Sequence, residues 1–481
     1  MEEGLETWSL LAEQKPGVNS NVGQHGGVAD GGSSSSSSAT AVVVLSTFVT
    51  CCGSFAYGCA YGYSSPAEFG IMYDLGLSTA EYSVFGSILT IGGVLGALIS
   101  GTVADLIGRR GTMWFFQTFC IMGWLAIVFA KDIGDHSWWL DFGRLSLGFG
   151  FGLHGYLAPV YIAEIAPKNT RGGFTAAIQL TACCGLSLMF FTGTFMHWRP
   201  LALIGTIPCL VQVVGVFFIP ESPRWLAKCR KEKEVEASLQ RLRGNNVDIS
   251  QEAADIKDYT ESFECLSESR FLDLFQWKYA HSLIVGVGLM SLVQFGGTNG
   301  ISYYASSIFK VAGTSTSIGT TTMAIIQIPF SALSILLMDK LGRRPLLMIT
   351  AAGAFFGSAL TGLAFLLQDL DQRKEIVAIL VFTGIVVYSA AYSMGLASTP
   401  WVIMSEIFPI NIKGSAGSLV NLANYFSAWI VSYAFNFLFE WSSSGVFFIF
   451  ASICCSIPLF VAMLVPETKG RTLEEIQASI T

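Results

Sequence analysis

The chain has 481 residues, of which 52% are apolar and only 13% are charged, and its formal net charge is −7. An ordinary soluble domain carries about 25% charged residues, so this chain has too little charge to cover a water-facing surface of its size. The composition therefore excludes an ordinary soluble protein and favours helices that face lipid. It contains no basic stripe, which argues against a nucleic-acid partner.

The first 40 residues are polar and rich in Gly and Ser. Such a segment cannot bury enough apolar surface to fold, so residues 1–40 are predicted to form a disordered cytosolic tail. Within it, Glu6, Leu10 and Leu11 match an acidic dileucine sorting signal of the kind that sorting adaptors bind. The alternative interpretation is an incidental apolar patch on a tail.

Twelve apolar runs follow, and each is long enough for a helix that crosses the hydrocarbon core, which takes about 20 residues. The runs lie near residues 41–63, 82–103, 112–131, 138–162, 173–195, 200–219, 281–303, 319–338, 346–367, 376–404, 415–439 and 444–465. An even number of crossings places both termini on the same side of the membrane.

Lys and Arg indicate which side that is, because they concentrate in cytoplasmic loops. With both termini in the cytoplasm, the short inner loops hold Arg109, Arg110, Lys168, Arg171, Lys340, Arg343, Arg344 and Lys413. The prediction is an all-α membrane protein with twelve transmembrane helices in two six-helix bundles and cytoplasmic termini. Its segments are a tail at 1–40, a bundle at 41–219, a cytosolic linker with short helices at 220–280, a second bundle at 281–465 and a short cytosolic tail at 466–481.

Three motifs occur once in each half of the chain, in the same order. The pairs are Asp105-Leu-Ile-Gly-Arg-Arg110 with Asp339-Lys-Leu-Gly-Arg-Arg344, Pro159-Val-Tyr-Ile-Ala-Glu164 with Pro400-Trp-Val-Ile-Met-Ser-Glu406, and Pro220-Glu-Ser-Pro-Arg224 with Pro466-Glu-Thr-Lys-Gly-Arg471. Matched pairs at matched depth indicate that six helices were duplicated in parallel orientation. Such repeats are typical of transporters whose two bundles rock about a central site.

These motifs resemble those of sugar porters of the major facilitator superfamily, and the resemblance covers about residues 41–478. The stretch from Ser54 to Pro66 is most similar to the plant early-dehydration-responsive (ERD-like) sugar transporters. The resemblance implies the major facilitator fold and a small-molecule sugar as the substrate. No cofactor is implied, and no Cys or His cluster has metal-ligand spacing. The dileucine motif resembles the signal used for plant vacuolar membranes, with the plasma membrane as the alternative.

Acidic and basic residues meet at the inner corners of both halves, where they can form ion pairs that hold the halves together and must break when the cytoplasmic side opens. The resemblance implies the same gate. The alternative is that these residues only reflect the topology of the chain in the membrane and contact lipid headgroups. The predicted gating residues are Asp105, Arg109, Arg110, Glu164, Arg171, Asp339, Arg343, Arg344 and Glu406. Tyr303 and Tyr304 resemble the family's outer gate, with an interfacial aromatic belt as the alternative.

A sugar site needs amides that both donate and accept hydrogen bonds, and an aromatic face for the C–H side of the ring. The predicted substrate-binding residues are Gln179, Gln294, Asn299, Gln327, Trp401 and Asn424. The resemblance implies that each matches a sugar-contacting position, with Gln327 in place of a family Asn. For any single amide, helix packing is the alternative. The family usually has a second Gln where this chain has Val293, so we expect one sugar hydroxyl to lose a partner, which would weaken binding or change the preferred sugar. Ala428 stands where some members carry a further Asn.

Proton-driven relatives resemble one another in pairing an Asp in the first helix with an Arg in the fourth. Here Arg144 is present, but the Asp position is Ala60. Asp141, one turn before Arg144, is the predicted local partner for its charge. Without an ionisable group in the first helix, facilitated diffusion is favoured. Proton symport through another acid, such as Asp141 or Glu164, stays open.

The predicted function is a hexose transporter that works by alternating access. The first rival is a sugar sensor that binds without transporting, but sensors of this type carry long cytosolic tails and only a short tail follows Pro466. An enzyme would need a nucleophile–base set or a metal site, and no such constellation is visible. A channel would need a selectivity filter or a ring of charged side chains, and neither is visible in the sequence.

Overall fold

The computed structural model describes residues 40–130, 138–167, 171–244, 247–265, 276–370, 374–408 and 413–468. The chain divides into the units Met1–Ser38 and Ala39–Thr481, and every described residue belongs to the second unit. The predicted disordered tail, apart from its last residue, and the sorting signal of Glu6, Leu10 and Leu11 lie outside the described residues.

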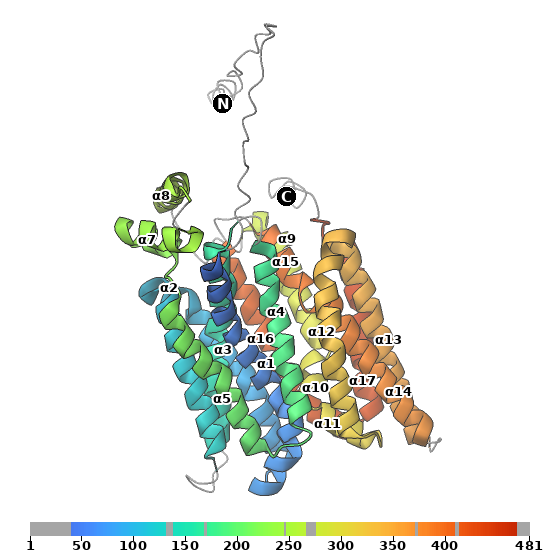
Figure 1. Ribbon diagram of the computed structural model, residues 1–481. Helices are drawn as coiled ribbons and strands as arrows, with labels where there is room; N and C mark the ends of the chain where they lie inside the picture. Colours follow the sequence, from blue (N-terminus) through green and yellow to red (C-terminus); the bar gives the residue numbers. More distant parts are fainter. Residues whose placement is uncertain are drawn as a thin grey trace, which may run out of the picture. The chain divides into compact units, whose positions relative to one another are not determined.

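The N-terminal half consists of long helices that run back and forth (Figure 1). They are α1 (Ala41–Leu75), α2 (Thr79–Val128), α3 (Trp138–Ile165), α4 (Arg171–Thr192) and α5 (Trp198–Gly215), which continues as the short 3-10 helix η1 (Val216–Phe218). The helix α2 comprises two crossings, because Gly108 at its middle has φ 80° and breaks the helical path. A positive φ of this kind favours glycine, and here it lets the chain turn back between crossings.

A linker of short amphipathic helices joins the halves. It contains α6 (Pro223–Lys228), α7 (Glu232–Arg243) and α8 (Ser250–Cys265). Leu226, Val235 and Leu239 form a small apolar cluster of their own there. The end of the helices that carries these elements is called the linker end below, and the opposite end, where residues 76–78 join α1 to α2, is called the far end.

The C-terminal half repeats the pattern with two broken helices. Its elements are α9 (Trp277–Phe295), α10 (Thr298–Tyr303), α11 (Ala305–Val311), α12 (Thr316–Leu341), α13 (Arg343–Asp369), α14 (Lys374–Ala391), the π-helix η3 (Tyr392–Leu396), α15 (Thr399–Ile407), α16 (Lys413–Trp441) and α17 (Ser443–Leu464). The segment α9–α11 crosses once and is broken at Gly297, which has φ 97°. The segment α14–η3–α15 also crosses once. Irregular backbone at membrane depth is tolerated where it lines a cavity.

The predicted fold class is confirmed in the described part of the chain. Eight helical stretches there are long and apolar enough to cross a membrane, and one of them, Thr79–Val128, is the pair of crossings broken at Gly108. The helices α3, α4 and α16 complete the set of twelve, with 28, 22 and 29 residues respectively. The predicted domain boundaries stay predictions.

The first helix is longer than predicted. The apolar run ends near residue 63, but α1 continues through Pro66 to Leu75. Proline is tolerated in membrane helices because neighbouring groups satisfy the freed backbone. The extension places Glu68 inside α1, where only 4% of its surface is exposed. The expectation that the first membrane helix carries no ionisable group is therefore wrong.

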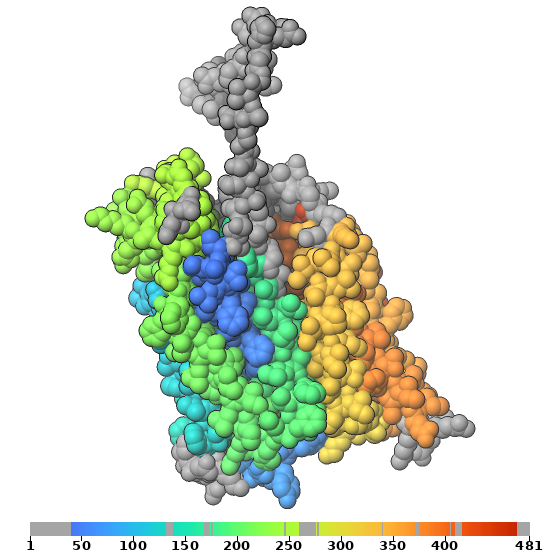
Figure 2. All heavy atoms as spheres, viewed as in Figure 1, coloured from blue at the N-terminus to red at the C-terminus, as the bar shows by residue number. Residues whose placement is uncertain are grey.

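The two halves meet along α2 with α16 and along α4 with α12. Figure 2 shows the second seam, where α4 in green and α12 in yellow lie side by side. Within the N-terminal half, α2 and α3 approach so closely that a Cβ on Gly148 would collide with the backbone of Leu89. Small residues allow this approach, which gives dispersion contacts in place of a hydrophobic driving force.

Candidate functional site

A cavity of about 170 Å³ lies between the two halves near the middle of the helices. All six predicted substrate-binding residues line it, together with side chains from α1, α2 and α3. The lining residues discussed below are Tyr57, Tyr61, Gln179, Cys183, Gln294, Asn299, Tyr303, Gln327, Tyr392, Trp401, Asn424 and Tyr425. The two broken helices contribute Gln294 and Asn299 from either side of the break at Gly297, and Tyr392 from the π-helix η3.

A chain of hydrogen bonds runs across the cavity. Asn299 Nδ2 donates to Gln294 Oε1 over 3.0 Å, and Gln294 Nε2 donates to Asn424 Oδ1 over 2.8 Å. Tyr61 from α1 donates its hydroxyl to Asn299 Oδ1, so the chain joins the two halves. Amides held in this way keep further donors and acceptors for a ligand, because each amide can make several hydrogen bonds.

The remaining predicted residues provide the other walls. Gln179 on α4 makes only a weak contact, from Nε2 to Cys183 Sγ over 3.8 Å. Gln327 on α12 is nearly buried, whereas Trp401 at the start of α15 is 40% exposed and presents an aromatic face. An amide with little internal bonding is available to bind a hydroxyl group.

Tyrosines make up a larger share of the cavity than the sequence suggested. Tyr57, Tyr61, Tyr392 and Tyr425 all line it, and none was predicted. Tyr57 and Tyr61 are one turn apart on α1, with ring centroids separated by 6.1 Å. Their spacing of four residues was the available signal, but an aromatic stripe on a membrane helix is equally compatible with packing. Hydroxylated rings suit a neutral, hydroxyl-rich ligand.

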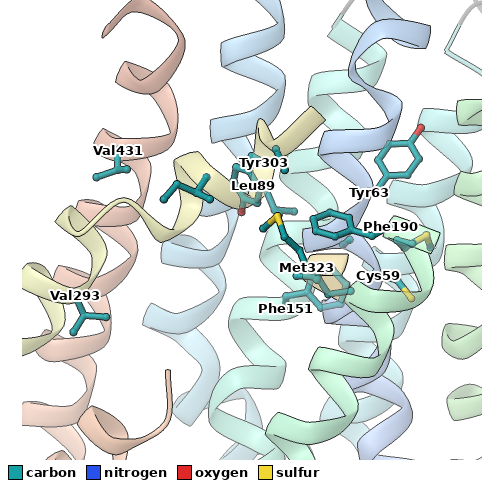
Figure 3. Packing of buried hydrophobic residues seen from close by; sticks show 14 of the residues in the cluster. Cys59, Tyr63, Leu89, Phe151, Phe190, Val293, Tyr303, Met323 and Val431 are labelled. Atoms are coloured by element: carbon teal, nitrogen blue, oxygen red, sulfur yellow. The ribbon is translucent and has the colours of Figure 1, made fainter. Parts of the chain in front are cut away.

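The two tyrosines predicted as an outer gate have different positions. Tyr303 lines the cavity, and its ring centroid lies 4.7 Å from that of Tyr61. Figure 3 shows Tyr303 on its short helix beside Leu89 of the other half. Tyr304 points away: its ring stacks on Phe435 at 5.3 Å, and its hydroxyl donates to Ser432 O over 3.2 Å. Only Tyr303 therefore stands directly over the cavity.

The far end of the seam is held closed by hydrogen bonds between the halves. Ser65 and Ser306 hydroxyls lie 2.9 Å apart, and Ser306 N also donates to Ser65 Oγ over 2.9 Å. The other bonds across the seam are Asn436 Nδ2 to Ser83 Oγ over 3.0 Å and Ser187 Oγ to Ala324 O over 2.8 Å. These bonds and the bond from Tyr61 to Asn299 connect the halves at the cavity and beyond it toward the far end.

At the linker end, the N-terminal half carries a network of charges. Arg109 donates to both Glu164 oxygens, over 2.9 and 2.8 Å, and to Asp105 over 3.2 Å. The Glu221 carboxylate accepts the backbone N–H groups of Arg109 and Arg110 over 3.0 and 3.1 Å, just after the break at Gly108. Burial raises the pKa of Glu221, and these backbone donors oppose that effect.

The described residues of the C-terminal half repeat the main bonds of this network. Arg343 donates to Glu406 over 3.0 Å. Glu467 accepts the backbone N–H groups of Arg343 and Arg344 over 3.2 and 3.1 Å, after Gly342 with φ 94°. The side chains of Arg171 and Asp339 lie outside the described part of the structure.

The described ion pairs of Arg109 and Arg343 lie within single halves. Arg109 pairs with Glu164 and Arg343 with Glu406, and the predicted gate between the halves stays a prediction. Each Arg directly follows a glycine with a positive φ. The turn there directs its side chain toward a glutamate near the end of a helix in the same half. These pairs brace each half as a unit.

Arg144 also differs from its predicted environment. It is fully buried and donates to Ala60 O over 2.8 Å and to Ser64 Oγ, both on α1. Its guanidinium carbon lies 4.6 Å from the centre of the Phe85 ring. The predicted pairing with Asp141 is not formed, because the side chain of Arg144 extends across to α1 and not along its own helix. A carbonyl, a hydroxyl and an aromatic face take the place of a carboxylate.

Comparison with known proteins agrees with this geometry. Residues 31–479 match the family described as "Sugar (and other) transporter". The chain is 53% identical to "Sugar transporter ERD6-like 11" and 54% identical to "Sugar transporter ESL1", both of Arabidopsis thaliana, over 91% of this chain and 93% and 92% of those proteins.

Solved structures show the same fold. The inward open conformation of the xylose transporter XylE from E. coli superposes with a TM-score of 0.78 at 25% identity, covering 91% of this chain and all of that one. The proton:xylose symporter XylE bound to 6-bromo-6-deoxy-D-glucose superposes with a TM-score of 0.76 at 25% identity, covering 92% and 99%. The chain therefore belongs to the sugar transporter family of the major facilitator superfamily, among relatives of the ERD6-like group.

Proposed function

We propose that this sugar transporter carries hexoses by alternating access and facilitated diffusion, with the cavity between the halves as the sugar site. The observation that carries the proposal is the hydrogen-bonded chain Tyr61–Asn299–Gln294–Asn424, which spans both halves. A neutral sugar that replaces the bond between Tyr61 and Asn299 would contact both halves at once. Its binding energy then changes when the halves move, as alternating access requires.

Facilitated diffusion is supported by the surroundings of Arg144. Its described hydrogen bonds go to a carbonyl and a hydroxyl, and the aligned position on α1 is Ala60. A proton-driven cycle needs an acid that alternates between protonated and paired forms beside the moving charge. Because the neutral partners of Arg144 do not titrate, its environment supports transport that does not require a proton.

The proposed gates follow from the two ends of the seam. The closure at the far end, over Tyr303, is released when Ser65 and Ser306 separate, and the braced halves move as units about the cavity. The sidedness predicted from Lys and Arg makes the linker end cytoplasmic. The dileucine motif in the tail supports the vacuolar membrane as the proposed location, with the plasma membrane as the alternative.

The test is uptake of radiolabelled glucose by proteoliposomes, with and without an inward proton gradient. We expect uptake that equilibrates without the gradient and is not accumulated by it. Gln179→Ala should lower uptake by about tenfold, since one lost hydrogen bond to a bound ligand costs about 1.4 kcal/mol. Gln251→Ala, on the exposed surface of α8, is the matched control and should leave uptake unchanged.

Other outcomes distinguish the alternatives. Accumulation of sugar against its gradient, driven by protons, would establish symport and refute facilitated diffusion. Binding of sugar without uptake would favour the sensor. Uptake of xylose or a polyol in place of glucose would keep the mechanism and change the substrate.

A further inference from the structure

Glu68 is a buried acid that the proposed transport cycle does not use. It lies on α1, with 4% of its surface exposed, and its Oε2 atom makes no hydrogen bond with the described residues. Ionisable side chains inside a membrane bundle are costly, and they usually serve a function. The position of Glu68 shows which function its carboxyl group can serve.

The carboxyl group faces the seam between the halves at the far end. Ser307 and Lys310, both on α11 of the other half, lie near enough to favour its charged form. One turn earlier on α1, Ser65 makes its bonds to Ser306. Beside it, the Lys310 ammonium lies 3.9 Å from the centre of the Phe69 ring. Glu68 is therefore part of the contact that closes the far end.

The other charged and titratable groups around Glu68 come from α2, from α3 and from the junction between α10 and α11. Tyr82 on α2 and Tyr304 at that junction are close enough for electrostatic interaction with Glu68. Arg144 on α3 is bonded one turn away, at Ser64. Lys310 is exposed to the surroundings, so its charge is screened.

We propose that Glu68 is a proton-binding site that controls the opening of the far end, binding its proton while the seam is closed and releasing it when the seam opens. This inference rests on the proposed alternating-access function. The proton regulates the movement and is not carried with the sugar, because the carboxyl group lies at the far-end seam and is not among the residues that line the cavity.

The direction of the pH dependence follows from the environment of the Glu68 carboxyl group in the closed and open states. In the closed state a charged carboxylate would keep one oxygen buried and without a hydrogen bond, which is costly. Separation of α1 from α11 admits water to that oxygen and hydrates the charge. Low pH on the far side therefore favours the closed seam and slows opening, and high pH favours opening. The effect is a linkage between proton binding and conformation.

The test is sugar counterflow in proteoliposomes with equal pH on both sides, so that no proton gradient can drive transport. For the unaltered protein we expect the exchange rate to fall by about tenfold as the pH is lowered. This factor corresponds to Glu68 binding its proton about tenfold more tightly in the closed state than in the open state. Glu68→Gln should be slow at every pH, because a neutral amide keeps the seam closed. Lys310→Gln and Ser307→Ala should move the midpoint of the pH dependence upward, since each removes a group that stabilises the carboxylate.

Controls separate this inference from the proposed function. Glu375→Gln removes an exposed carboxylate at the start of α14 and should retain the normal pH dependence. If Glu68→Gln misfolds, the pH midpoints of Lys310→Gln and Ser307→Ala still test the role of Glu68. Counterflow with a pH dependence that is unchanged in all three seam variants would overturn the role of Glu68 while leaving the transport function intact. Absence of counterflow in the unaltered protein at any pH would instead refute the proposed function.

Discussion

The far end of the seam and the linker end carry different kinds of polar contact. At the far end, uncharged hydroxyl and amide groups of one half bond to the other half, as in Ser65 with Ser306 and Asn436 with Ser83. At the linker end, buried ion pairs such as Arg109 with Glu164 stay inside one half. The difference suggests a division of labour, in which ion pairs keep each half rigid and weaker neutral bonds set the conformation.

This division has an energetic reason. A buried ion pair is expensive to separate, because each charge would be left without its partner in a low-dielectric surrounding. Neutral hydrogen bonds contribute about 1 kcal/mol each and can be exchanged for bonds to water. A seam that must open in every cycle is therefore better closed by neutral bonds than by buried ion pairs. The acid Glu68 at this seam makes the opening sensitive to pH in our proposal.

The largest expected effect is on the Arg109 brace. Arg109→Ala leaves Glu164 buried and unpaired, so we expect a loss of about 3–5 kcal/mol in the free energy of unfolding. Thermal unfolding in detergent measures this loss. A variant as stable as the unaltered protein would show that the pair is not a brace.

The matching change in the other half should be milder. Arg343 makes one described side-chain bond to Glu406, and the two side chains are 18% and 23% exposed. For Arg343→Ala we expect a loss of about 2 kcal/mol, between the values for buried and surface pairs. The same unfolding measurement compares the halves, and a loss larger than that of Arg109→Ala would contradict the ranking by burial.

The smallest effect on stability is expected for Ser65→Ala, which should shift the balance between the closed and open far end. Ser65→Ala removes both bonds to Ser306. We expect a cost of about 1 kcal/mol to the closed seam, which shifts the ratio of open to closed molecules about fivefold. Distances between spin labels on α1 and α11 report that ratio. Ser452→Ala, on the exposed face of α17, is the control. If the distances did not change, the neutral bonds would not be what closes the far end.

Local sequence features determined much of this protein. Hydropathy predicted the twelve crossings, because the cost of burying polar backbone in lipid is paid by each helix separately. The repeated motifs predicted a duplication of six helices, and the matching glycines Gly108 and Gly342 both have a positive φ, a conformation that favours glycine. The amides Gln179 and Asn424 line the cavity, because polar side chains of membrane helices usually face a cavity or one another.

Only the tertiary structure decided which groups are partners. Arg109 pairs within its own half, Arg144 bonds to α1 in place of Asp141, and Tyr61 reaches the cavity while Tyr304 does not. α1 extends past Pro66, and Glu68 in this extension is buried where α1 contacts α11. The physical reason is that these features arise from contacts between segments far apart in the chain. Such contacts depend on the packing of whole helices, whereas spans and turns depend on neighbouring residues.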